Sequence, residues 1–390
     1  MLDARSIRAP GAGSTRHLGR LSLRNYRNFE ELDVELPASG VAVVGPNGSG
    51  KTNLLEAIYY LEVLRSFRGV GDSQLVRFGE DVFRIEGEVG DGSCSVAAAY
   101  DRARRIKRVE VDDREVERVS EGFGRLGVAV FRLEDADIIR GGPQERRRFL
   151  DVTLSLTEPG YLTRLQRYRA LLGQRNEALR RGATVSELSV WSDGLVETGA
   201  SIAFSRERWV AEGNERYARY YETVSGGDEA SIEYVPSVGT GAVGPRTGDD
   251  DLGAWVVRFR RALEASADRE RRSGMTVVGP HRDELRFPVH GTGGSRDLRR
   301  YGSSGQQRTA ALALRLLEAD RLKDHLGLEP VYLLDDVFAE LDEDRSRRLL
   351  ELFETDREGQ VILTAPKAED VTLPGRGLAR WRMEDGRLSS

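Results

Sequence analysis

The chain has 390 residues, of which 39% are hydrophobic and 32% charged, and its formal net charge is −5. This length predicts two lobes or domains, and the composition is that of an ordinary folded protein. No stretch reaches the roughly 20 apolar residues that span a membrane, and the single cysteine, Cys94, excludes an internal disulfide and a multi-cysteine zinc site. We therefore expect a cytoplasmic protein.

The first 17 residues contain no apolar run of the kind found in secretory signals, and their Gly, Ser and Pro content predicts a disordered extension over 1–17. Alternating or continuous apolar residues then predict strands over 18–29, 32–37 and 41–45. Apolar positions on one side of 52–64, at Leu54, Leu55, Ile58 and Leu61, predict a helix. Further short strands are expected over 82–89, 94–100, 105–113 and 128–131.

The middle of the chain has a different pattern. Residues 143 to about 221 predict three long helices, with Pro143 as a suitable first helical residue. After a Gly-rich and acidic interruption, another helix is expected near 255–271. The remaining elements are expected to be a strand over 275–279, a helix over 303–322, a strand over 331–336, a helix over 343–354 and a strand over 360–365.

This order predicts an α/β lobe built from both ends of the chain, 18–142 and 274–390, with a helical lobe of 143–273 inserted between them. Strands and helices alternate at the C-terminal end, which favours a largely parallel sheet.

A phosphate-binding loop is indicated where an apolar strand meets the first helix, in the segment Gly45-Pro46-Asn47-Gly48-Ser49-Gly50-Lys51-Thr52. Its glycines let backbone N–H groups surround phosphates, and the helix N-terminus favours an anion. Lys51 is expected to reach the β- and γ-phosphates, and Thr52 to hold Mg²⁺ through its hydroxyl. A glycine-rich turn that matches by chance is disfavoured by the strand before it and the helix after it.

Two adjacent carboxylates, Asp335 and Asp336, end the apolar strand Val331–Leu334. Such a pair is costly in a protein core without a cation. Asp335 is expected to support Mg²⁺, and Asp336 to orient or deprotonate an attacking water. A strand end that simply emerges into solvent is the alternative.

A second anion site is indicated at the start of a helix by Ser303, Gly305 and Gln306 in the segment YGSSGQQ. An ordinary serine N-cap explains this segment better when it is taken alone. In combination, the phosphate loop, a long insertion, SSGQ, LLDD and AELD follow the order of an ATP-binding cassette. In that superfamily the Ser-Gly-Gln segment of one subunit covers the γ-phosphate held by the other.

Within that superfamily, several segments resemble the RecF family: LSLRNYRNF, RSFR, FRLEDADIIRGGPQERRRFLD, QRN, VVGPHRDEL, SSGQQRTAALALRLLEAD and LLDDVFAELD. The resemblance spans about residues 18–366. It implies an SMC-like ATPase head with a mixed sheet and an inserted helical lobe, which forms an ATP-dependent homodimer. It also implies binding of double-stranded DNA and of single-strand/double-strand junctions, and loading of RecA at gaps with RecO and RecR.

Some positions depart from the superfamily pattern. Ala365, beside Thr364, stands near the place of a histidine that contacts the γ-phosphate, and Asp336 stands where a glutamate is usual. Both differences predict slow ATP hydrolysis. Gln74 is the nearest candidate for the glutamine of the Q-loop.

Surfaces for DNA are less clearly marked. Three basic clusters are candidates, although each is equally consistent with a solvated face: Arg102, Arg104, Arg105, Lys107 and Arg108; Arg146, Arg147 and Arg148; and Arg269, Arg271 and Arg272. Further candidates for nucleotide or DNA contacts are Arg65, Arg68 and the group His281, Arg282 and Asp283, whose members also suit structural roles. A transporter ATPase subunit and a nucleotide-gated scaffold remain alternative functions, and the broken insertion is too short for a long coiled-coil arm.

Overall fold

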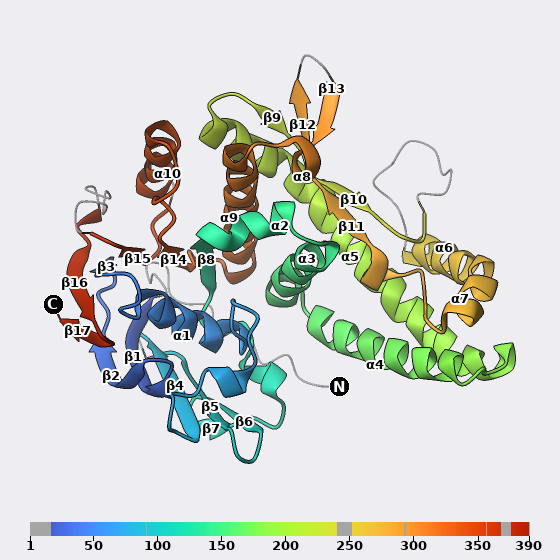
Figure 1. The fold of residues 1–390 in the computed structure, drawn as a ribbon, viewed down its shortest axis with the longest axis horizontal. Coiled ribbons are helices and arrows are strands. Elements are labelled where there is room, and N and C mark those ends of the chain that lie inside the picture. The colour runs from blue at the N-terminus through green and yellow to red at the C-terminus, as the bar shows by residue number, and fades with distance from the viewer. Residues whose placement is uncertain are drawn as a thin grey trace. The chain divides into compact units, whose positions relative to one another are not determined.

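The computed structural model describes residues 17–90, 92–239, 252–291, 294–355, 357–367 and 376–389 (Figure 1). The chain forms a terminal unit, made of Met1–Arg132 and Leu322–Ser390, and a central unit, Leu133–Arg321. The sequence interpretation divided the chain at 142/143 and 273/274 instead. The later boundary differs because Leu285, Leu298 and Ala310 share a hydrophobic cluster with the helices of the central unit. The extension expected over 1–17 lies, except for His17, outside the described residues.

The terminal unit contains two six-stranded sheets. The antiparallel sheet has the order β2-β1-β4-β5-β6-β7 and consists of β1 (Leu18–Tyr26), β2 (Phe29–Glu35), β4 (Val82–Val89), β5 (Ser95–Asp101), β6 (Ile106–Val111) and β7 (Arg114–Glu115). The mixed sheet has the order β17-β16-β3-β15-β14-β8 and consists of β3 (Gly40–Val44), β8 (Val128–Arg132), β14 (Val331–Asp335), β15 (Val361–Ala365), β16 (Ala379–Glu384) and β17 (Arg387–Ser389). Its pairs are parallel except for β16 with β17.

Helix α1 (Lys51–Val63) contacts strands of both sheets of the terminal unit, as Figure 1 shows. It is therefore buried on nearly all sides rather than on the single side that its apolar residues predict. Two carboxylates of the helix, Glu56 and Glu62, are fully buried. Glu56 pairs with Arg27 at 2.9 Å, and Glu62 accepts hydrogen bonds from the backbone N–H groups of Leu126 and Gly127. Each buried charge is thus matched by donors. Helix α10 (Glu343–Thr355) also belongs to this unit.

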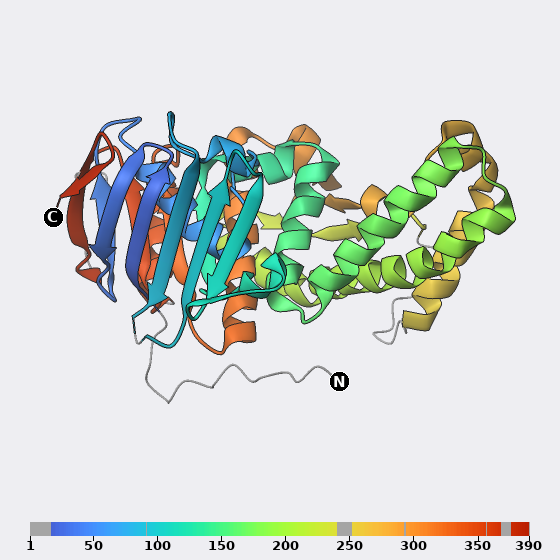
Figure 2. The same cartoon turned by 90° about the horizontal axis from the view of Figure 1, so that it is seen from below.

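The central unit is mainly helical (Figure 2), and none of the described helices is both long and apolar enough to cross a membrane. The three long helices expected over 143–221 are present as α3 (Pro143–Thr157), α4 (Tyr161–Arg180) and α5 (Val185–Ser225). A capping box between Thr184 and Glu187 starts α5, and Gly226, in left-handed conformation, ends it. The other helices are α2 (Ala136–Arg140), α6 (Leu252–Ala265), α7 (Ala267–Ser273), α8 (Leu298–Tyr301) and α9 (Ser304–Leu326), whose last turn belongs to the terminal unit.

Two small sheets complete the central unit, with the orders β10-β11 and β13-β12-β9. None of their strands was predicted. They are β9 (Glu229–Ala230), β10 (Glu233–Val235), β11 (Glu284–Arg286), β12 (Pro288–Gly291) and β13 (Gly294–Asp297).

The strand expected over 275–279 is wrong. Side chains bind the backbone N–H groups that a neighbouring strand would need: Asn176 binds that of Thr276, Glu270 that of Val277, and Ser237 that of Gly279. The single helix expected near 255–271 is also divided at Ser266 into α6 and α7.

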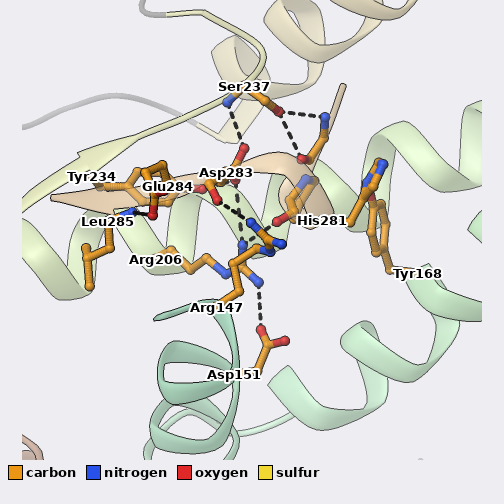
Figure 3. Close-up of polar contacts among 12 residues, drawn as sticks. Arg147, Asp151, Tyr168, Arg206, Tyr234, Ser237, His281, Asp283, Glu284 and Leu285 are labelled. Atoms are coloured by element: carbon orange, nitrogen blue, oxygen red, sulfur yellow. Dashed lines mark hydrogen bonds and ion pairs between the residues drawn. The ribbon is translucent and has the colours of Figure 1, made fainter. Parts of the chain in front are cut away.

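A buried polar network joins three elements of the central unit (Figure 3). Arg206 of α5 is 2% exposed and donates hydrogen bonds to Asp151 of α3 and to the carbonyl oxygen of Pro280, both at 2.7 Å. Asp283 lies 3.6 Å from the Arg206 guanidinium and accepts a hydrogen bond from the backbone N–H of Ser237 at 2.7 Å. Burial raises the pKa of Asp283, although the nearby cation acts against this shift.

His281 extends the same network toward α4. Its Nε2 atom lies 3.0 Å from the carbonyl oxygen of Thr276 and must donate, so Nδ1 accepts the hydrogen bond from the Tyr168 hydroxyl at 2.7 Å. This arrangement uses the neutral imidazole. Burial lowers the pKa of His281 to about 4, which keeps the ring neutral in the folded protein.

We predict that His281 makes the protein less stable in acid. Between about pH 6.5 and pH 4 the unfolded chain gains a proton at His281 that the folded chain does not, so the free energy of unfolding falls as pH falls. In His281→Gln this contribution is absent, while glutamine can still donate to Thr276 and accept from Tyr168. The stability difference between wild type and variant should therefore shift by about 3 kcal/mol in favour of the variant from pH 7 to pH 4.

Urea unfolding at a series of pH values measures this difference. Because wild type and variant both contain Asp283, the contribution of Asp283 to the pH dependence cancels in the comparison. His325→Gln, at an exposed position near the end of α9, serves as the control and should keep the wild-type profile. Parallel stability curves for wild type and His281→Gln would contradict the assignment.

Candidate functional site

The predicted phosphate loop lies between the end of β3 and the start of α1. All eight predicted residues, Gly45, Pro46, Asn47, Gly48, Ser49, Gly50, Lys51 and Thr52, are found in this loop and the first turn of the helix. Gly48 and Gly50 have positive φ angles of 82° and 116°, which residues with a Cβ rarely adopt. The loop therefore presents backbone N–H groups at a helix N-terminus, where an anion binds favourably.

Lys51 lies across this loop rather than in solvent. Its side chain is 4% exposed, and Nζ donates hydrogen bonds to the carbonyl oxygens of Gly45 at 2.7 Å and Pro46 at 3.1 Å. A cation is thus held at the mouth of the loop, where phosphate oxygens would be its natural partners.

The predicted metal-binding pair comes together in the terminal unit. Asp335 ends β14, and its Oδ1 atom accepts hydrogen bonds from the Thr52 hydroxyl at 3.0 Å and the Thr364 hydroxyl at 2.8 Å. Since β3, β15 and β14 are neighbouring parallel strands, their carboxyl ends meet at one edge of the sheet. A carboxylate and a hydroxyl beside a phosphate loop fit the oxygen ligands that Mg²⁺ prefers.

Asp336 continues from this edge with a left-handed backbone. Its φ angle is 49°, in the left-handed region, and its N–H donates to the Thr364 hydroxyl at 3.1 Å. Thr364 therefore fixes both acids of the pair. Ala365 ends β15, and its carbonyl oxygen accepts a hydrogen bond from the N–H of Gly45 at the start of the loop.

The Ser-Gly-Gln segment belongs to the central unit. Ser303 precedes α9, and its hydroxyl accepts a hydrogen bond from the N–H of Gln306, while the Gln306 side chain accepts one from the N–H of Ser303. This is a capping box, so the structural role considered for Ser303 is present. Ser303 is exposed and Gly305 half-buried at the N-terminus of this 23-residue helix.

The three basic clusters do not form uniform charged faces. Lys107 is mostly buried between Asp72 and the carbonyl oxygen of Leu64, and burial lowers its pKa. Arg146 is 1% exposed and makes a bidentate pair with Glu284. Lys107 and Arg146 are therefore structural, and so are poor candidates for contacts with a partner.

Other members of these clusters are also paired. Arg104 contacts Asp101, Arg108 contacts Glu115 and Arg271 contacts Asp268.

Arg68 lies near the first turn of α1, whereas Gln74 and Arg65 are exposed in the connection that follows this helix. Arg68 donates to the side-chain oxygen of Asn53 at 3.0 Å, one residue after Thr52. His281 and Asp283 are members of the buried network of the central unit, which accounts for both residues structurally.

Three residues at the phosphate loop were not predicted. The Asn28 side chain and the Gly386 N–H both donate to the carbonyl oxygen of Ser49, and the Asn53 side chain donates to Asn28. The pair Asp385-Gly386 is a typical two-residue hairpin turn, so the sequence contained a signal for the hairpin. It contained no signal that this turn contacts a loop more than 330 positions earlier.

The chain matches the RecF/RecN/SMC N terminal domain family over residues 17–379. It is 36% identical over 347 residues to the DNA replication and repair protein RecF of Halalkalibacterium halodurans, covering 86% of this chain and 89% of the relative. The RecF of Chloroflexus aggregans is 36% identical over 405 residues, covering 95% and 99%.

Solved structures agree with these relatives. The recombination mediator protein RecF-ATP in the RecFOR pathway has a TM-score of 0.86 at 29% identity, covering 96% of this chain and 97% of that structure. An Smc head domain from Pyrococcus furiosus, with a TM-score of 0.54 at 14% identity and coverage of 96% and 95%, shares the fold. The predicted SMC-like head fold is thus confirmed, and the chain belongs to the RecF family of DNA replication and repair proteins.

Proposed function

We propose that this chain binds ATP with Mg²⁺, forms an ATP-dependent homodimer on DNA and hydrolyses ATP slowly. The observation that carries the proposal is the hydrogen bond from Thr52 to Asp335, because it joins the phosphate loop to an acidic strand end 283 positions later. The relatives support it, since one of the similar structures is described as RecF-ATP.

Each residue of the site has a proposed role. The phosphate loop, Gly45 to Thr52, binds the phosphates, with Lys51 on the β- and γ-phosphate oxygens. Thr52 and Asp335 would hold Mg²⁺, which supplies neutralisation of phosphate charge. Asp336 orients the attacking water and accepts its proton.

The second half of each site is proposed to come from the partner subunit of the dimer. Ser303, Gly305 and Gln306 lie at a helix N-terminus, where a hydroxyl and backbone N–H groups suit the γ-phosphate. The short Asp336 side chain and Ala365 in place of a histidine support slow turnover.

The DNA-related part of the proposal rests on the family. The relatives are DNA replication and repair proteins, and a similar structure is a recombination mediator in the RecFOR pathway. We therefore propose binding to double-stranded DNA and to single-strand/double-strand junctions, and loading of RecA at gaps with RecO and RecR. The proposed location is the cytoplasm. The transporter and scaffold alternatives gain no support from these relatives.

Lys51→Ala tests the function as a whole. Wild type should dimerise with ATP but not with ADP, and should bind a gapped duplex more tightly with ATP, with log affinity falling linearly with log salt. The variant should bind ATP at least about tenfold more weakly, because it loses charge-assisted hydrogen bonds, and should neither dimerise nor respond to ATP on DNA.

ATP titration, sizing and DNA titration measure these effects. Lys323→Ala, which removes a half-exposed lysine of the same unit, is the matched control. If Lys51→Ala binds ATP with wild-type affinity, the proposed function is contradicted.

Asp336→Asn tests the chemistry. Asparagine tolerates the left-handed backbone as aspartate does, so the variant should fold and bind ATP normally. Loss of the general base should slow ATP turnover by about 10²- to 10⁴-fold and leave a longer-lived dimer. Asp113→Asn, at an exposed position with a φ angle of 62°, controls for the same change at a left-handed residue. Steady-state turnover equal to wild type would assign the base to another residue.

Ser303→Arg tests the composite site. The variant should bind ATP but fail to dimerise, because a bulky side chain fills the junction over the partner's nucleotide. Ser189→Arg, at an exposed serine near the start of α5, should dimerise normally.

Mixing Ser303→Arg with Lys51→Ala gives the sharper test. In the mixed dimer one site combines an intact phosphate loop with an intact Ser-Gly-Gln segment, while the other site carries both defects. Weak association and partly recovered ATPase activity are expected by sizing and phosphate release. If Ser303→Arg alone dimerises normally with ATP, the segment acts only as a helix cap and the composite site is contradicted.

A further inference from the structure

Two tight turns from different sheets converge on one carbonyl group of the phosphate loop. The carbonyl oxygen of Ser49 accepts a hydrogen bond from the Asn28 side-chain amide at 3.0 Å and another from the backbone N–H of Gly386 at 2.9 Å. Ser49 is 3% exposed. A buried carbonyl with two donors is held firmly in one direction.

The first turn joins β1 to β2 in the antiparallel sheet. Tyr26 pairs with Phe29, so Arg27 and Asn28 form a two-residue turn. The Asn28 side-chain oxygen accepts from Asn53 of α1 at 2.7 Å, which fixes the orientation of its amide.

The Asn28 amide also lies close to the loop backbone. A Cβ atom on Gly50 would come within 2.4 Å of the Asn28 side-chain nitrogen. This amide therefore fills the space that the missing side chain of Gly50 leaves.

The second turn joins β16 to β17 near the C-terminal end of the chain. Glu384 pairs with Arg387, and the turn residues Asp385 and Gly386 have φ angles of 46° and 76°. These values fit a type I′ hairpin turn. Because β16 pairs in parallel with β3, the hairpin reaches past the end of β3 to the loop, where a Cβ on Gly45 would lie 2.2 Å from the Met383 carbonyl oxygen.

The direction of the Ser49 carbonyl decides where the next N–H points. In a trans peptide unit the C=O of one residue and the N–H of the following residue point in opposite directions. With the Ser49 oxygen held by two donors, the Gly50 N–H is directed to the other side of the peptide unit, away from Asn28 and Gly386. A carbonyl oxygen turned inward would instead repel an anion.

We propose that Asn28 and Gly386 are positioning residues that hold the phosphate loop in its anion-binding conformation before nucleotide arrives. The inference rests on the proposed ATP binding and assigns part of its affinity to the C-terminal hairpin. A loop held in its bound conformation loses less conformational freedom on binding.

The test compares ATP dissociation constants of four proteins: wild type, Gly386→Ala, Asn28→Ala and the double variant. A Cβ on Gly386 would meet the Asn28 backbone oxygen at 2.9 Å, so the turn must move away from the loop. Each single variant should bind ATP about fivefold more weakly, the effect of one net hydrogen bond. The double variant should lose more than the product of the two single effects, because each single variant leaves the Ser49 carbonyl one donor.

Gly327→Ala is the matched control. Gly327 lies in the same unit with a φ angle of 69°, and a Cβ there would meet nothing within 4 Å. It should lose stability in urea from its left-handed backbone alone, less than Gly386→Ala, which adds the contact with Asn28, and yet bind ATP like wild type. Weaker ATP binding in Gly386→Ala under conditions where both variants are fully folded separates a positioning role from a structural one.

The outcomes are distinct. If wild type binds no ATP, the proposed function fails. If wild type binds ATP and both single variants bind it equally well, or if the double variant equals the product of the singles, the inference is overturned. Gly386→Asn, a residue type that tolerates left-handed backbone, replaces Gly386→Ala if the alanine variant proves unfolded by circular dichroism.

Discussion

The hydrogen bonds between Thr52, Asp335 and Thr364 are the constraint on which the terminal unit depends. They require three parallel strands to end at the same level, so that a loop after β3 and the last residues of β14 and β15 share one edge. The phosphate loop can then start α1 between the two sheets. Most of that helix is buried, and each of its buried carboxylates has a partner from a surrounding loop. The same contacts therefore fix both the geometry of the site and the packing of the unit.

The central unit is also held together by buried charged groups that have partners. Its helices meet around Arg206, a fully buried cation that contacts Asp151 and lies near Asp283. Removing one member of such a cluster leaves an uncompensated charge, whereas the complete cluster is satisfied. In the same way, Arg146 is paired with Glu284 and Lys107 with Asp72. Runs of basic residues in this chain thus include members such as Arg146 and Lys107 that serve internal packing, beside members that face solvent.

Local signals explain which parts could be predicted from sequence. The glycine-rich loop after β3, the acidic strand end and the long helices depend on neighbouring residues, and these elements form where the sequence predicts them. The segment 275–279 has strand-like residues but no strand, because side chains from three other segments take its N–H groups. Asn28 and Gly386 could not be assigned, since their importance arises only when distant turns meet at Ser49.

The left-handed backbone of Asp336 limits which residues can replace it. At a φ angle of 49° glycine, asparagine and aspartate cost less than other residues, although Arg27, Leu64 and Arg105 also have φ angles of 53° to 56° in this chain. The longer glutamate usual in the superfamily would gain reach toward water, but its backbone would have to adopt a conformation that glutamate disfavours. If Asp336 acts on water as proposed, replacing it with glutamate alone would therefore exchange stability for rate. Another substitution would have to be made first, one that changes the turn after β14 so that residue 336 no longer needs a left-handed backbone.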